Sequence, residues 1–183
     1  MRKKLHYFIN MRNLIRIMKL LVTGGLGFIG SNFISRVFEN HENWSVVNVD
    51  AELYGSNHQS LEKFENNSKY SFVKGNITDQ ELMEKLVSES DVVVNFAAES
   101  HVDRSISNAR PFIDSNILGV FTLLETIKKM KKKLIHISAD EVYGSFNSDS
   151  AKEETRLNPS SPYAASKASA ELLIQSYITT HGC

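Results

Sequence analysis

The sequence lacks the residues on which several kinds of site depend. Its only cysteine, Cys183, is the last residue, which excludes an intrachain disulfide, a thiolate-rich zinc site and an iron–sulfur cluster. His101 has no second histidine at metal-ligand spacing, so we expect no metal site. This cysteine usage fits a reducing compartment, and we expect a cytoplasmic protein.

The chain also lacks an excess of either charge and a long apolar run. The 21 Lys and Arg residues balance the 21 Asp and Glu residues, so no overall basic field exists to hold nucleic acid or an anionic membrane. No stretch approaches the roughly 20 apolar residues of a membrane span. We therefore expect neither a nucleic-acid nor a membrane partner, and any bound phosphate must be held by local contacts.

The length of 183 residues and the 42% hydrophobic content fit one globular domain. No acidic residue precedes Glu39, and basic residues crowd the first seventeen positions. We expect residues 1–17 to be an extension outside the fold and residues 18–183 to form the domain. Gly182 follows an apolar helical pattern, as a helix C-cap before another strand would, so we expect this domain to be incomplete.

Short apolar runs rich in β-branched residues alternate with segments of helical spacing. The runs predict strands at 20–23, 46–49, 70–73, 92–96 and 134–138, and the spacing predicts helices at 28–38, 80–87, 112–127 and 163–177. Strands that alternate with helices indicate βαβ crossovers. The sequence therefore predicts an α/β fold with a doubly wound, Rossmann-like parallel sheet.

A glycine-rich turn follows the first predicted strand and begins the first predicted helix. Such glycines allow a tight turn and bring backbone N–H groups against a pyrophosphate, while the helix N-terminus supplies partial positive charge. The candidate cofactor-binding residues of this turn are Gly24, Gly27, Phe28, Ile29 and Gly30. An ordinary glycine-rich turn is the alternative interpretation.

Asp50 ends the second predicted strand, where a carboxylate accepts hydrogen bonds from the adenosine ribose of a dinucleotide. It would also repel a 2′-phosphate, so we expect NAD rather than NADP. A carboxylate that only caps a helix remains the alternative for Asp50. At the end of the fourth strand, the small residues Ala97 and Ala98 would let the nicotinamide half approach the backbone.

Tyr163 and Lys167 stand four residues apart, on one face of the last predicted helix. A nearby ammonium favours a phenolate, so the pair predicts a tyrosine with a lowered pKa that acts as a general base. Asp140 and Glu141 follow the fifth predicted strand, at the sheet edge where such folds bind ligands. Two acids of this kind divide acid and base duties, unless they only form a solvated turn.

Together these motifs resemble the extended short-chain dehydrogenase/reductase family. The likeness spans residues 18–182, and the runs Ala97–Ile106, Asp140–Gly144 and Pro162–Lys167 narrow it to the dTDP-glucose 4,6-dehydratases. The resemblance implies a tightly bound NAD, a dTDP-sugar substrate and a homodimer when full length. The product would be dTDP-4-keto-6-deoxyglucose, a deoxysugar precursor.

The resemblance also implies a role for each candidate residue. Tyr163 takes the C4 hydroxyl proton, and Lys167 holds both the phenolate and the nicotinamide ribose. Glu141 removes the C5 proton while Asp140 protonates the departing C6 hydroxyl. By the same likeness the remaining residues lie near the cofactor or substrate, or beneath the site: Asn76, Ile77, Ser100, Arg104 and Asn116.

Three departures from the family pattern leave alternatives open. Ala139 stands where the family has a threonine that hydrogen-bonds the sugar C4 oxygen, and Ser138 should face the opposite side of the strand. Asn76 replaces an aspartate that meets the adenine amine, although Asn keeps an acceptor oxygen. The family's C-terminal substrate domain is missing. The alternatives are another sugar-nucleotide enzyme, such as a UDP-sugar 4-epimerase, or a non-catalytic dinucleotide-binding fragment.

Overall fold

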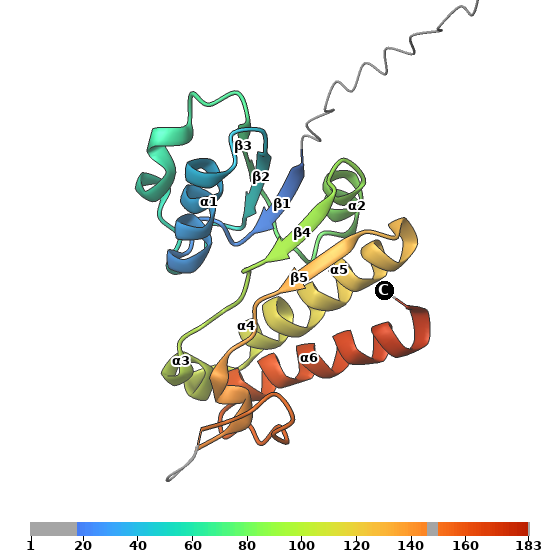
Figure 1. Ribbon diagram of the computed structural model, residues 1–183. Coiled ribbons are helices and arrows are strands. Elements are labelled where there is room, and N and C mark those ends of the chain that lie inside the picture. Colours follow the sequence, from blue (N-terminus) through green and yellow to red (C-terminus); the bar gives the residue numbers. More distant parts are fainter. Residues whose placement is uncertain (1–17, 146–149, 183) are drawn as a thin grey trace, which may run out of the picture.

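The computed structural model describes residues 18–145 and 150–182, so the expectation for residues 1–17 lies outside the described part. Five parallel strands form one sheet in the order β3-β2-β1-β4-β5 (Figure 1). The strands are β1 (Lys19–Thr23), β2 (Ser45–Asp50), β3 (Tyr70–Lys74), β4 (Val92–Asn95) and β5 (Lys133–His136). This order reverses at β1, as in a doubly wound sheet, and it confirms the predicted Rossmann-like fold.

Helices connect the strands as the alternating pattern predicts. They are α1 (Phe28–Asn40), the 3₁₀-helix η1 (His58–Phe64), α2 (Gln80–Ser88), α3 (Val102–Ser107), α4 (Arg110–Phe112), the π-helix η2 (Ile113–Leu118), α5 (Gly119–Met130), the 3₁₀-helix η3 (Asp140–Tyr143) and α6 (Pro162–His181). The predicted helix at 112–127 is divided among α4, η2 and α5. The short helices η1, α3 and η3 were not predicted.

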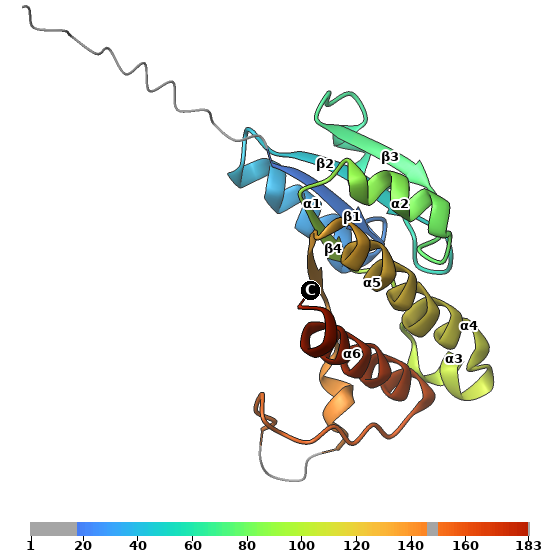
Figure 2. The same ribbon diagram turned by 90° about the vertical axis from the view of Figure 1, so that its right-hand side faces the viewer.

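The two faces of the sheet are covered by different helices (Figures 1 and 2). On one face α1 and η1 pack through Ile34, Val37 and Leu61. On the other face α2 and α5 contribute Met83 and Leu123, among others. Because successive strand residues face opposite ways, adjacent residues of β1 enter both cores. This arrangement holds the carboxyl ends of the strands together at one edge of the sheet.

Helix α6 lies alongside α5 (Figure 2) and packs on it through Leu124 and Ala170. Its N-terminus is well defined, because Pro162 occupies the first turn and the Ser161 hydroxyl accepts a hydrogen bond from the Ala164 N–H at 3.1 Å. Among the described residues, no helix has the length and hydropathy needed to cross a membrane.

Candidate functional site

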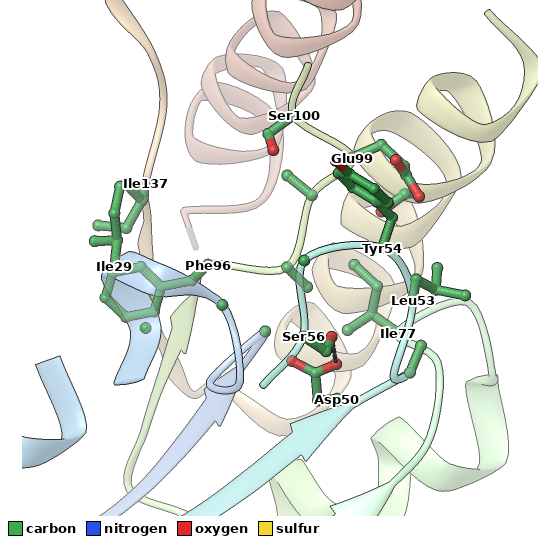
Figure 3. Close-up of a pocket in the computed structure, with 18 of the residues that line it drawn as sticks. Ile29, Asp50, Leu53, Tyr54, Ser56, Ile77, Phe96, Glu99, Ser100 and Ile137 are labelled. Atoms are coloured by element: carbon green, nitrogen blue, oxygen red, sulfur yellow. Dashed lines mark hydrogen bonds between the residues drawn. The ribbon is translucent and has the colours of Figure 1, made fainter. Parts of the chain in front are cut away.

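A cleft of about 410 Å³ lies at the carboxyl ends of the strands (Figure 3). This is the position at which open α/β sheets bind ligands. Most of the residues predicted from the sequence line it: Gly24, Gly27, Phe28, Ile29, Gly30, Asp50, Asn76, Ile77, Ala97, Ala98, Ser100, Tyr163 and Lys167. The cleft therefore brings the glycine turn and the Tyr163–Lys167 pair into one space.

At two positions of the glycine turn, a side chain would collide with neighbouring backbone atoms. Gly24 has φ +70°, and a Cβ atom there would lie 2.5 Å from the Ala97 nitrogen. A Cβ on Gly30 would lie 2.4 Å from the Gly24 carbonyl oxygen. Beside this turn, Phe28 is 84% exposed at the first turn of α1. A glycine turn that leads into a helix N-terminus at an open cleft suits a pyrophosphate, so the turn fits NAD.

Asp50 is buried at the end of β2, and both of its carboxylate oxygens accept hydrogen bonds. Oδ2 accepts from the Leu26 N–H at 3.0 Å, and Oδ1 accepts from the Glu52 N–H at 2.9 Å and from the Ser56 hydroxyl at 2.8 Å. Because each oxygen has two lone pairs, Oδ2 retains one for a ribose hydroxyl. Asp50 thus both shapes the cleft and keeps an acceptor for a ligand.

Asn76 lies at the rim of the cleft, in the loop after β3. Its Oδ1 accepts hydrogen bonds from the N–H and the hydroxyl of Thr78, both at 3.0 Å. The acceptor oxygen that was expected to meet an adenine amine is therefore occupied by its own loop. The neighbouring Ile77 is buried and also lines the cleft.

Lys167 is 4% exposed on α6 and donates a hydrogen bond from Nζ to the Ile137 carbonyl at 2.6 Å. Burial lowers its pKa from 10.5 to about 8, although Glu171 and Glu141 oppose this shift. The ammonium is therefore held at the end of β5 and directed toward the cleft. A lysine in this condition exchanges protons close to neutral pH.

The structure corrects the expectation for Tyr163. Its pKa is raised rather than lowered, because burial disfavours the phenolate and the carboxylates of Glu141 and Asp140 repel it. Lys167 donates its hydrogen bond to the Ile137 carbonyl, and its charge does not outweigh these effects on the pKa of Tyr163. The sequence analysis considered the ammonium but did not weigh the two carboxylates against it.

Three predicted site residues do not line the cleft. Asp140 and Glu141 lie exposed in η3, close enough to Tyr163 to shift its pKa. Arg104 forms an ion pair with Glu99 at 2.9 Å and borders a second hollow beside α3. Ala139 precedes η3 in an extended conformation and is not among the cleft residues.

A hydrogen-bond network fixes the first turn of α6, and Asn116 is the member of it that was expected beneath the site. Asn116, in the π-helical η2, donates to the Ser166 hydroxyl at 2.9 Å and to the Glu99 carbonyl at 3.0 Å, and accepts from the Glu99 N–H at 2.8 Å. The Tyr163 N–H donates to the Ser105 hydroxyl at 3.0 Å. The loop after β4 and the start of α6 are thereby joined.

The sequence analysis missed the loop of residues 51–57, which supplies part of one wall of the cleft. Leu53, Tyr54 and Ser56 line the cavity from this loop (Figure 3). The available signal was Gly55, which has φ +90° and marks a turn directly after the acidic residue that ends β2.

The doubly wound sheet, the glycine turn and the Tyr163–Lys167 pair define an NAD-binding short-chain dehydrogenase/reductase. A family model described as "GDP-mannose 4,6 dehydratase" matches residues 21–183. The chain belongs to this family, and it is related to the NAD-dependent dTDP-glucose 4,6-dehydratases.

Known proteins support this relationship. A dTDP-glucose 4,6-dehydratase from Mycobacterium tuberculosis is 45% identical over 168 residues, which are 90% of this chain and 50% of the relative. The crystal structure of the Streptomyces venezuelae dTDP-glucose 4,6-dehydratase with NAD and TYD bound is 40% identical, with a TM-score of 0.86 over 90% of this chain and 53% of that one.

A UDP-glucose 4-epimerase from Thermotoga maritima is less similar, with 30% identity and a TM-score of 0.79 over 90% of this chain and 52% of that structure. The chain spans about half the length of the curated relatives that it matches. The predicted resemblance to the dehydratases is confirmed.

Proposed function

We propose that the protein acts as a dTDP-glucose 4,6-dehydratase, which converts dTDP-glucose into dTDP-4-keto-6-deoxyglucose with a tightly bound NAD. One observation carries the proposal: Tyr163 and Lys167 line the same cleft as the glycine turn and Asp50. The adjacent carboxylates of Asp140 and Glu141, which raise the pKa of Tyr163, supply the acid and base that an elimination of water needs.

NAD, when bound, accepts a hydride from C4 of the sugar and returns it at C6. Tyr163 takes the proton from the C4 hydroxyl, which leaves a 4-keto sugar. A raised pKa makes the phenolate scarcer but a stronger base. In this proposal the buried Lys167 binds the nicotinamide ribose, and its charge favours the phenolate without outweighing burial and the two carboxylates, which leave the pKa of Tyr163 raised.

The ketone acidifies the C–H bond at C5. Glu141 removes the C5 proton as Asp140 protonates the C6 hydroxyl, and water leaves. Both carboxylates are exposed in η3, so this step requires the substrate to bind across the η3 side of the cleft.

The substitution Glu141→Gln tests this assignment in the chain joined to the C-terminal half of the Mycobacterium tuberculosis relative. We expect NADH to form from dTDP-glucose in a single turnover, while exchange of the C5 proton with deuterated water is abolished. Tyr163 and Glu141 act in separate steps, so the first survives the loss of the second. The matched control is Glu62→Gln, which changes an exposed glutamate of η1 that does not line the cleft.

Unchanged C5 exchange in Glu141→Gln would remove Glu141 from the mechanism. The product separates the proposal from its alternatives. A 4-keto-6-deoxy sugar supports the dehydratase, a sugar inverted at C4 identifies a UDP-sugar 4-epimerase, and NAD binding without turnover identifies a non-catalytic module. The roles of Ser100 and Arg104 toward substrate, and the homodimer, stay predictions.

A further inference from the structure

Four side chains connect the two sides of the cleft at its mouth: Arg104, Glu99, Tyr54 and His101, whose ring meets the Tyr54 ring edge-on at 5.0 Å between centroids. The guanidinium of Arg104, on α3, lies over the ring of Tyr54 at 4.5 Å from its centroid. The same guanidinium donates from Nη1 to Glu99 Oε2 at 2.9 Å. Tyr54 belongs to the loop after β2 and Glu99 to the loop after β4, and Figure 3 shows these two side chains next to each other. We call this contact the Tyr54–Arg104 bridge.

The Tyr54 side of the bridge is held in place by its own loop. Asp50 Oδ1 accepts hydrogen bonds from the Glu52 N–H and the Ser56 hydroxyl, on either side of Tyr54. Glu52 also forms an ion pair with Lys74 and a hydrogen bond with His58 Nε2 at 2.5 Å. The ring of Tyr54 is nevertheless 68% exposed, so packing in the core does not explain its position.

The Arg104 side is held more firmly. The residue Glu99 is 7% exposed, and Asn116 binds both its N–H and its carbonyl. A buried carboxylate needs a cationic partner, and Arg104 supplies the one ion pair recorded for Glu99 among the described residues. The outer face of the guanidinium is then directed to a ring on the opposite side of the cleft, which is a favourable cation–π arrangement.

We propose that Tyr54 and Arg104 are positioning residues that retain the dinucleotide by joining the two sides of its cleft. Asp50, Tyr54 and Glu99 all line the cavity, so a ligand held at Asp50 leaves between the loops that the bridge connects. The inference rests on the proposed function only in requiring that the cleft bind NAD. It concerns the rate at which the dinucleotide leaves the cleft and not any step of the reaction.

The test measures the dissociation of NADH from the protein by stopped-flow fluorescence, with excess NAD as the chase. Tyr54→Leu removes the ring and should speed dissociation roughly 2- to 5-fold, the size expected for a cation–π contact at an exposed site. Tyr54→Phe keeps the ring and is the matched control, which should retain the slow rate. Arg104→Met should speed dissociation at least as much, because it also leaves the buried Glu99 without its cation, and adding Tyr54→Leu to Arg104→Met should bring little further change.

Each outcome decides the question. Dissociation from Tyr54→Leu at the parent rate, or effects of the two substitutions that multiply in the double variant, would overturn the bridge. Loss of the slow rate in Tyr54→Phe would assign the effect to the hydroxyl instead of the ring. A parent protein that binds no NADH would overturn the proposed function together with this inference, whereas binding with unaltered rates would remove the inference alone.

Discussion

His136 is a partly buried histidine whose environment favours the neutral ring. The Asn95 amide lies 3.0 Å from His136 Nδ1, and the Asn95 Oδ1 accepts a hydrogen bond from the Thr23 hydroxyl. This orientation of the amide makes Nδ1 the acceptor and places the proton on Nε2, which is buried without a hydrogen-bond partner in the described part of the chain. Burial, and then the charge of Lys167, lowers the pKa of His136 from 6.5 to about 4.

This shift predicts a loss of stability in acid. Between pH 6.5 and about 4 the unfolded chain binds a proton that the folded protein does not, so the free energy of unfolding falls as the pH decreases through this window. His136→Gln retains an acceptor for Asn95 but does not titrate. In urea denaturation, we expect the parent protein to lose about 2 to 3 kcal/mol more than the variant between about pH 7.5 and about pH 4.5. Equal losses would show that His136 titrates normally.

At the scale of elements, the crowding of the glycine turn before α1 predicts which of its glycines a methyl group would destabilise most. A Cβ on Gly30 would lie 2.4 Å from the Gly24 carbonyl oxygen and 2.9 Å from the Gly25 Cα, whereas a Cβ on Gly27 has its nearest neighbour at 3.3 Å. Gly30→Ala should therefore destabilise the protein by about 1 to 3 kcal/mol, despite the helix propensity of alanine.

Gly27→Ala is the matched control and should cost clearly less. Both values come from urea denaturation without cofactor, so that contacts with a pyrophosphate do not enter the comparison. Equal stabilities of the two variants would mean that the turn relaxes around the added methyl group.

The sequence predicted the five strands from their apolar, β-branched runs, which are buried in the central strands β1, β2 and β4 and only partly buried in the edge strands β3 and β5. It did not predict the π-helix η2, because that segment depends on the contacts of Asn116 with Glu99 and Ser166, which are distant in sequence. Periodicity reports which residues are buried along one helix, but it carries no information about such partners.

The parts of the candidate site that a sequence motif defines were predicted. The parts that depend on the position of a single side chain were missed. The glycine turn and the Tyr163–Lys167 pair both line the cleft as expected. Tyr54 gave no signal, since an exposed tyrosine in a polar loop is ordinary until its distance to Arg104 is known. The direction in which the pKa of Tyr163 shifts also required knowing how far the phenol is buried and how close the carboxylates of η3 lie.

For the whole molecule, the chain spans about half the length of its curated relatives, yet the described part already contains the glycine turn and the Tyr163–Lys167 pair. Among the residues that the structure describes, strand β5 pairs with β4 alone, and its Ile135 is 52% exposed. We expect the 183-residue chain to bind NAD but to give negligible product from dTDP-glucose. The same chain joined to the C-terminal half of a relative should turn over.

Isothermal titration with NAD and product analysis by mass spectrometry check this prediction together. Turnover by the 183-residue chain at the rate of the joined protein would show that the described part holds the substrate without help.

The first turn of α6 is joined to the cofactor side of the molecule by two short paths, from Tyr163 to Ser105 and from Ser166 through Asn116 to Glu99. A small rotation at one end of a helix displaces the other end by a larger distance. Helix ends also fray more than turns that are anchored by hydrogen bonds. Here the reactive phenol is located by hydrogen bonds at its own end of α6, so its distance to the cleft does not depend on the roughly 21 Å of that helix beyond Lys167. Fluctuation at the far end of α6 can thus be large while the reacting atoms keep their spacing.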